Sequence, residues 1–84
     1  MSMNRWNYKT HKYDSYEVPL NWICTTYSPN MSAIVNCPHC GKEFEFGEGY
    51  TSMEIHTESG FGYTVCPDCY EDEWIRRRYY EGRR

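Results

Sequence analysis

Cys37-Pro38-His39-Cys40-Gly41 and Cys66-Pro67-Asp68-Cys69-Tyr70 are the two stretches that decide the fold of this 84-residue chain. Each stretch holds a Cys-x-x-Cys pair, and twenty-five residues separate the two pairs. Four thiolates are the ligand set that tetrahedral Zn²⁺ favours in closed structural sites. We therefore expect one structural zinc ion, and its expected ligands are Cys37, Cys40, Cys66 and Cys69.

Two disulfides, or a redox-active pair, are the alternative use of these cysteines. The N-terminus from Met1 to Tyr8 has no apolar segment of the kind that a secretion signal requires, and no thioredoxin-like βαβ pattern surrounds either pair. Both observations favour thiolate ligands in a cytoplasmic protein. The fifth cysteine, Cys24, is expected to be a small apolar residue, because four ligands already complete the tetrahedron.

The two halves of the predicted site differ in local structure. Gly41 follows the first pair and can adopt the left-handed conformation that a tight turn, a zinc knuckle, requires. The second pair lies at the start of a helical pattern that begins at Pro67 and ends near Gly82. Free N–H groups at a helix start stabilise thiolates. The apolar stripe expected to pack this helix on the core is Tyr70, Trp74, Ile75, Arg78 (through its aliphatic stem) and Tyr79.

Extended structure is expected before and between the two pairs. Ile34–Asn36 leads into the first pair, and residues 50–58 alternate as in a half-buried strand, with Ser52, Glu54 and His56 on the solvent face. A turn at 59–62 and a return strand at 63–65 would complete a β-hairpin that delivers Cys66. The fold class is thus a small, metal-stabilised α+β domain.

The order of these parts, a Cys-Pro-x-Cys-Gly knuckle, a hairpin and a Cys-Pro-x-Cys helix start, resembles the treble-clef zinc fingers over about Ile34 to Tyr80. The segment from Cys66 to Trp74 is also similar to short uncharacterised zinc proteins of bacteria and bacteriophages. The first resemblance implies the fold. The second implies a cytoplasmic location, which is the host cytoplasm if the protein is encoded by a phage.

The composition indicates a thin core, because only eleven residues are Leu, Ile, Val or Phe. Nine Tyr and three Trp supply the missing apolar area. We expect residues 1–33 to form an N-terminal arm that packs on the metal-binding domain of residues 34–84. Trp22, Ile23, Cys24 and Tyr27 are expected to form a short strand within this arm.

The leading functional hypothesis is a non-catalytic module that binds a protein through the aromatic side chains of the arm, since interfaces favour Tyr and Trp. It leaves the identity of the partner and the oligomeric state open. The proposed partner-binding residues are Trp6, Tyr8, Tyr13, Tyr16, Trp22 and Tyr27.

The alternative is a nucleic-acid-binding finger that uses the basic C-terminus. The net charge of −3, which becomes −5 once four thiolates and one Zn²⁺ are counted, argues against it, as do nine acidic residues and no Lys or Arg between Glu43 and Ile75. The residues that would contact phosphates are Arg76, Arg77, Arg78, Arg83 and Arg84.

No enzyme class fits the sequence. His-Asn-His nucleases need a second histidine on the helix, and this helix has none, so His56 is expected to be a solvent-facing polar residue. Zinc deaminases need a Pro-Cys-x-x-Cys segment after their His-x-Glu segment, and neither cysteine pair of this chain is preceded by proline; a four-thiolate site also leaves no open coordination position for hydrolysis. His39 lies between two ligands and is expected to point outward.

Overall fold

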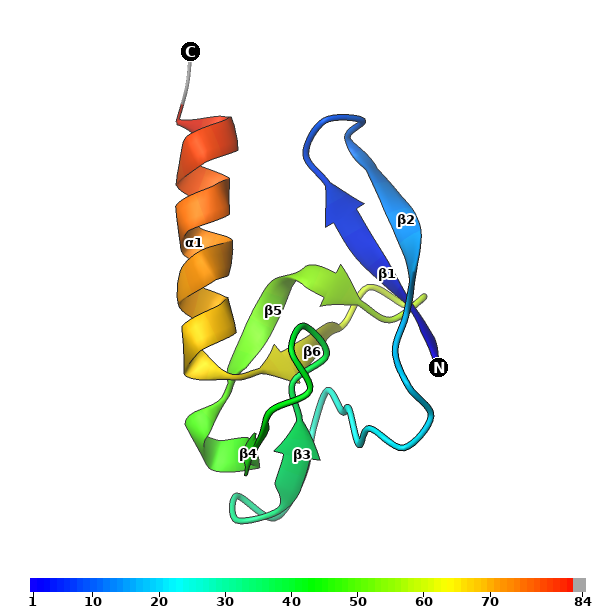
Figure 1. Ribbon diagram of the computed structural model, residues 1–84, viewed down its shortest axis with the longest axis vertical. Helices are drawn as coiled ribbons and strands as arrows, with labels where there is room; N and C mark the ends of the chain where they lie inside the picture. Colours follow the sequence, from blue (N-terminus) through cyan, green and yellow to red (C-terminus); the bar gives the residue numbers. More distant parts are fainter. Residues whose placement is uncertain (83–84) are drawn as a thin grey trace.

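The protein is described by a computed structural model that covers residues 1–82. Antiparallel strands and one C-terminal helix make up the fold, in accordance with the predicted α+β class (Figure 1). The elements are β1 (Ser2–Asn7), β2 (Lys12–Glu17), β3 (Ile34–Asn36), β4 (Glu43–Glu45), a short 3₁₀ turn (Phe46–Glu48), β5 (Tyr50–His56), β6 (Gly62–Val65) and α1 (Pro67–Glu81). No helix among the described residues is long and apolar enough to cross a membrane.

The N-terminal arm contributes two strands to the main sheet, whose order is β2-β1-β5-β6. β1 pairs with β2 along its whole length, from Ser2 opposite Glu17 to Asn7 opposite Lys12. It also pairs with β5 through Asn4 and Arg5. The arm therefore forms a regular hairpin, β1–β2, which extends the sheet formed by β5 and β6. The alternation of small, polar and aromatic residues in β1 and β2 was too irregular to predict this hairpin.

The strand expected at Trp22–Tyr27 does not form, and this prediction is wrong. The segment is a loop whose backbone groups bond to two different sheets. Ile23 exchanges hydrogen bonds with Asn36 at the end of β3, and the Thr25 carbonyl accepts one from the Thr64 N–H in β6. These single bonds hold the two sheets together without a ladder.

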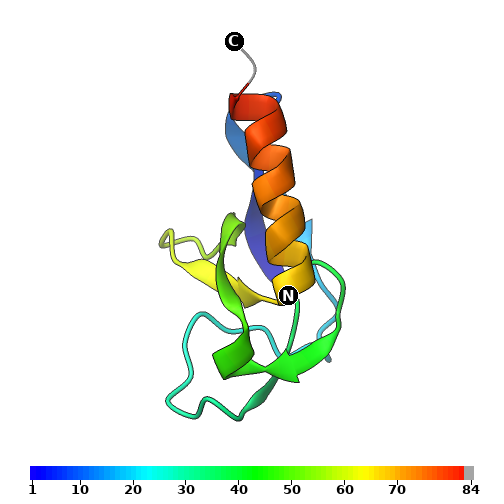
Figure 2. The ribbon, with the colours of Figure 1, turned by 90° about the vertical axis from the view of Figure 1, so that its left-hand side faces the viewer.

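The predicted knuckle turn, β-hairpin and helix start are confirmed, whereas strand β4 was not predicted. β3 and β4 form a two-stranded sheet that carries the first pair in its connecting turn, and the β5–β6 hairpin delivers Cys66 to the start of α1. Figure 1 shows β3 and β4 at one end of the molecule, while α1 and the β1–β2 hairpin extend toward the other. The side view places α1 alongside that hairpin (Figure 2).

The helix packs with a different face from the one predicted. Trp74 and Ile75, the centre of the expected core-facing stripe, are 41% and 52% exposed, whereas Glu73 is completely buried. The prediction is wrong because β5 offers α1 the polar side chains of Ser52 and Glu54, both buried. The polar face of α1 therefore packs on β5, because its side chains can form hydrogen bonds with Ser52 and Glu54.

The apolar core is divided into two small clusters. One surrounds the cysteines and consists of Val35, Cys37, Phe44, Val65 and Cys66. The other lies under the N-terminal hairpin and consists of Met3, Val18 and Ile55, with Cys24 packed against it. Because neither cluster is large, we expect the hydrogen bonds and ion pairs that join the sheets to α1 to contribute a large part of the folding stability.

Candidate metal centre

The first cysteine pair lies in a tight turn between β3 and β4. The Cys37 N–H donates to the Lys42 carbonyl, and the Gly41 N–H donates to the Cys37 carbonyl at 2.7 Å. Gly41 has a φ of +79°, and a Cβ atom there would lie 2.4 Å from Cζ2 of Trp22. Glycine is thus required twice, for the backbone conformation and for the close approach of the indole.

The second pair begins the helix. Cys66 is the N-cap residue with an extended backbone, and Pro67 follows as the first helical residue, as predicted. The Tyr70 N–H donates to the Cys66 carbonyl and closes the first turn. This turn brings Cys69 back to the side of the helix on which Cys66 lies.

The structure brings all four predicted ligands together. The Sγ atoms of Cys37, Cys40, Cys66 and Cys69 lie within 4.8 Å of one another, and those of Cys40 and Cys66 are 3.9 Å apart. A tetrahedral zinc ion with Zn–S bonds of about 2.3 Å would require sulfur–sulfur distances of about 3.8 Å. All five cysteines are free thiols. The donor set and its spacing therefore fit one zinc ion and not two disulfides.

Burial and mutual contact control the protonation of these thiols. Burial raises the pKa of the Cys37 thiol to about 11 and also raises that of Cys69. At Cys40 burial acts in the same direction, but hydrogen bonds from the Lys42 backbone and the neighbouring thiols outweigh it and lower the pKa. Cys40 is also exposed. Cys40 is therefore the thiol that deprotonates and binds a cation most readily. Binding of a metal by all four thiols must release protons.

A buried polar network that the sequence did not predict attaches the knuckle to the helix. The Glu73 carboxylate accepts hydrogen bonds from the Ser52 hydroxyl at 2.5 Å, the Met53 N–H at 2.7 Å and His39 Nε2 at 2.6 Å. His39 therefore points inward, contrary to prediction. The hydrogen bond between His39 and Glu73 thus links the turn of the first cysteine pair to the helix of the second.

A second carboxylate completes this network. Glu54, which is 1% exposed, accepts two hydrogen bonds from the Arg76 guanidinium at 2.8 and 2.9 Å. The expectation that Ser52 and Glu54 face solvent is wrong for both residues. One sequence signal indicated that the apolar stripe of the helix does not face the core. Glu71 and Arg78 lie in the middle of this stripe, which is unusual for a face that packs on a core.

His39, Glu54 and Glu73 also place ligand atoms within 4.8 Å of one another, but they do not make a second cation site. Arg76 already neutralises Glu54, and the Glu73 carboxylate already accepts three hydrogen bonds, from His39, Ser52 and Met53. Among the described residues, no buried side-chain polar atom lacks a partner. We interpret the group as a satisfied structural network.

The six aromatic residues proposed to bind a partner do not share one surface. Trp6, Tyr8 and Tyr16 line a cleft of about 420 Å³ between the N-terminal hairpin and α1. Tyr13 lines an adjoining hollow of about 250 Å³ together with Trp6 and Tyr8. Four of the six residues therefore border two connected depressions.

The other two aromatic residues lie elsewhere. Trp22 covers Gly41 at the knuckle and packs on the Met3 cluster, so its indole is structural. Tyr27 is 70% exposed and contacts Phe46 edge-on, beside the metal-binding end.

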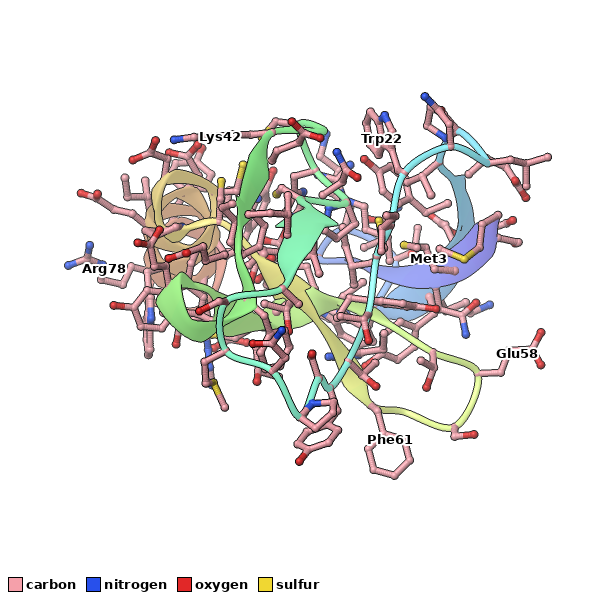
Figure 3. The ribbon with its side chains drawn as sticks, turned by 90° about the horizontal axis from the view of Figure 1, so that it is seen from below. Met3, Trp22, Lys42, Glu58, Phe61 and Arg78 are labelled. Atoms are coloured by element: carbon pink, nitrogen blue, oxygen red, sulfur yellow. The ribbon has the colours of Figure 1, made fainter. Side chains whose placement is uncertain are left out.

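The basic residues of the helix point in several directions. Arg76 is held inward by Glu54, and Arg77 pairs with Glu81 at 2.9 Å while its guanidinium lies over the Trp74 ring. Arg78 projects from the far side of the helix (Figure 3). Arg83 and Arg84 lie outside the described residues. The described arginines thus do not form one continuous basic surface.

His56 lies half-buried at the end of β5, where its ring contacts Tyr13 through a 3.1 Å hydrogen bond between Nδ1 and the hydroxyl. No other histidine or carboxylate among the described residues joins it in a metal-binding group. Comparison with known proteins yields no matching family model, no matching curated protein and no matching solved structure.

Proposed function

We propose that this protein is a zinc-stabilised, non-catalytic module that binds a protein partner in the cleft between the N-terminal hairpin and α1. The zinc ion would be held by the four cysteines, with the knuckle, hairpin and helix arranged as a treble-clef finger. Its role would be structural, because four thiolates leave no open coordination position.

The observation that carries the proposal is the placement of Trp6, Tyr8 and Tyr13 along the two depressions instead of in the core. Trp6 and Tyr8 border both depressions, and Tyr13 is 51% exposed at the rim. Tyr8 stacks on Tyr80 at a centroid distance of 5.0 Å, which braces the hairpin against the helix. Preformed, braced aromatic side chains bind partners with little loss of conformational entropy.

The cleft also has polar groups that can orient a partner. Arg5, Lys9 and Asp14 line it beside the aromatic rings, so it presents both signs of charge. A mixed rim around aromatic anchors is typical of protein interfaces. A deep, purely apolar pocket for a small molecule would look different.

An affinity capture with the tagged, zinc-loaded protein tests the proposal. The lysate is treated with nuclease, and wild type is compared with Trp6→Ala and Tyr13→Ala, while Tyr27→Ala serves as a control for an exposed aromatic residue outside the cleft. We expect proteins that wild type and Tyr27→Ala retain and that both cleft variants lose. Equal capture by all four proteins would contradict the cleft assignment.

Nucleic-acid binding is the competing outcome of the same experiment, performed without nuclease. A test that removes Arg76 would be misleading, because its guanidinium neutralises buried Glu54. The informative variants are Arg77→Gln and Arg78→Gln. Recovery of nucleic acid alone, reduced in these variants and weakened by salt, would overturn the proposal in favour of a nucleic-acid-binding finger.

A further inference from the structure

The outer face of α1 is an amphipathic surface that the fold leaves uncovered. At about 100° per residue, Glu71 and Arg78 lie on nearly the same line along the helix, with Trp74 on one side and Ile75 on the other. Buried Glu73 lies on the opposite side of the helix. Trp74 and Ile75 are 41% and 52% exposed, so a large apolar area surrounds two opposite charges.

The charges on this face have no partner within the described part of the chain. Neither Glu71 nor Arg78 takes part in any ion pair found among residues 1–82, although Arg76 and Arg77 on the same helix both do. Figure 3 shows Arg78 extending away from the rest of the molecule. Arg78 lies seven positions after Glu71, or about 10.5 Å along the axis, too far for the two side chains to pair with each other.

The positions of these four residues are symmetric about one point. Glu71 and Arg78 lie equally far from the midpoint between Trp74 and Ile75, on either side of it. When two such helices pack antiparallel about a two-fold axis through this midpoint, Glu71 of each copy lies level with Arg78 of the other. Trp74 then meets Trp74, and Ile75 meets Ile75, across the axis.

We propose that the protein forms a homodimer through the outer face of α1, with the two helices antiparallel and two Glu71–Arg78 pairs flanking a centre of Trp74 and Ile75. The face complements itself in both charge and apolar character, as an isologous interface must. A second copy is therefore the occupant that this surface fits.

Neighbouring side chains prepare the surface for this contact. Tyr50 stacks on Tyr70 at 4.6 Å, and Tyr70 meets Trp74 edge-on at 6.3 Å, so the indole is supported from one side. A hollow of about 590 Å³ beside it, bordered by Pro67, offers room for an aromatic side chain of the second copy. The cleft between the hairpin and α1 lies on the other side of the helix and stays open in such a dimer.

Sedimentation velocity of the zinc-loaded protein, from about 1 µM to about 1 mM, tests the proposal over the range of weak affinities. Wild type should shift from monomer to dimer. Glu71→Arg or Arg78→Glu alone places two pairs of like charges in contact and should raise the dissociation constant about tenfold or more. The double variant Glu71→Arg/Arg78→Glu restores opposite charges and should restore the dimer.

The controls separate this arrangement from other contacts. Glu58→Arg makes the same charge change in the exposed β5–β6 turn, far from Arg78 (Figure 3), and should dimerise like wild type. Zinc content and circular dichroism check that each variant is folded. A monomer at all concentrations would overturn the proposal. So would a dimer that the single reversals do not weaken, or one that the double variant fails to restore.

Discussion

Replacing Glu73 by alanine is the most direct test of the network that joins the knuckle to the helix. The carboxylate is completely buried and accepts three hydrogen bonds. Without it, the Met53 N–H and His39 Nε2 keep no acceptor, and each orphaned buried donor costs about 1–3 kcal/mol. The loss in unfolding free energy should therefore be about 3–5 kcal/mol, the range typical of removing one partner from a buried charged pair.

Urea denaturation of the zinc-loaded protein under reducing conditions measures this loss. With an m-value near 1 kcal/mol/M for a domain of this size, the urea midpoint should fall by roughly 3–5 M. Glu73→Gln keeps one acceptor oxygen and should lose about half as much. Asp72→Asn makes the equivalent change on an exposed neighbour and should stay within about 0.5 kcal/mol of wild type.

The pH of the experiment follows from the protonation of Glu73. Burial alone would raise its pKa, but the hydrogen bonds from His39, Ser52 and Met53 outweigh burial and lower the pKa below 4.5. Its stabilisation is thus fully present above pH 4.5 and is lost as the pH falls through the lowered value, so pH 7 reports it completely. If Glu73→Ala unfolds at the same urea concentration as Asp72→Asn, the assignment of a structural network is wrong.

Four further predictions concern the metal and the residues that support its site. Chelation should unfold the domain at pH 7, observed by circular dichroism, because structural zinc contributes about 10–16 kcal/mol apparent against a net stability of about 5–15. Burial raises the pKa of the Cys37 thiol from 9.0 to about 11, so the metal-free fold keeps this thiol protonated at neutral pH and loses stability as the pH rises from about 9 to about 11. Apparent zinc affinity in competition titrations should therefore fall about tenfold or more per unit from pH 8 to pH 6; a flat profile would contradict thiolate ligation. Gly41→Ala should lose about 2–4 kcal/mol in urea denaturation, because its Cβ would collide with Trp22, whereas Gly60→Ala, with φ +91° and open space around it, should lose only about 1–2. Arg76→Met should lose about 3–5 kcal/mol by leaving Glu54 buried and unpaired, and a loss no larger than that of Arg78→Met would show that the pair is not structural.

Residue type and short-range spacing were sufficient to predict much of the fold around the cysteines. Two Cys-x-x-Cys pairs, the glycine after the first and the proline within the second, predicted the turn, the helix start and the four-thiol cluster. The structure places β5 at Tyr50–His56, β6 at Gly62–Val65 and α1 at Pro67–Glu81, close to the predicted bounds. These features depend on contacts between residues that are near in the chain, or on a ligand number that chemistry fixes.

The sequence pattern failed where a residue's surroundings come from distant parts of the chain. Periodicity identified an apolar stripe on α1 but assigned it to the core, because a hydrophobic pattern shows which residues share a face and not what covers that face. The core-facing side instead holds Glu73 and Arg76, since β5 presents Ser52 and Glu54 to them. Only a network in which every charge has its partner makes such burial favourable.

By itself, then, the sequence determined the cluster of four cysteines, the β-hairpin and helix of the C-terminal part and the α+β class, because these follow from residue type and spacing. The tertiary structure alone decided that the N-terminal arm joins the main sheet, that Trp22 supports the knuckle, and that His39 turns inward to Glu73. Each of these depends on contact between residues at least nineteen positions apart in the sequence, and no local pattern encodes which distant partner will satisfy a given polar or aromatic group.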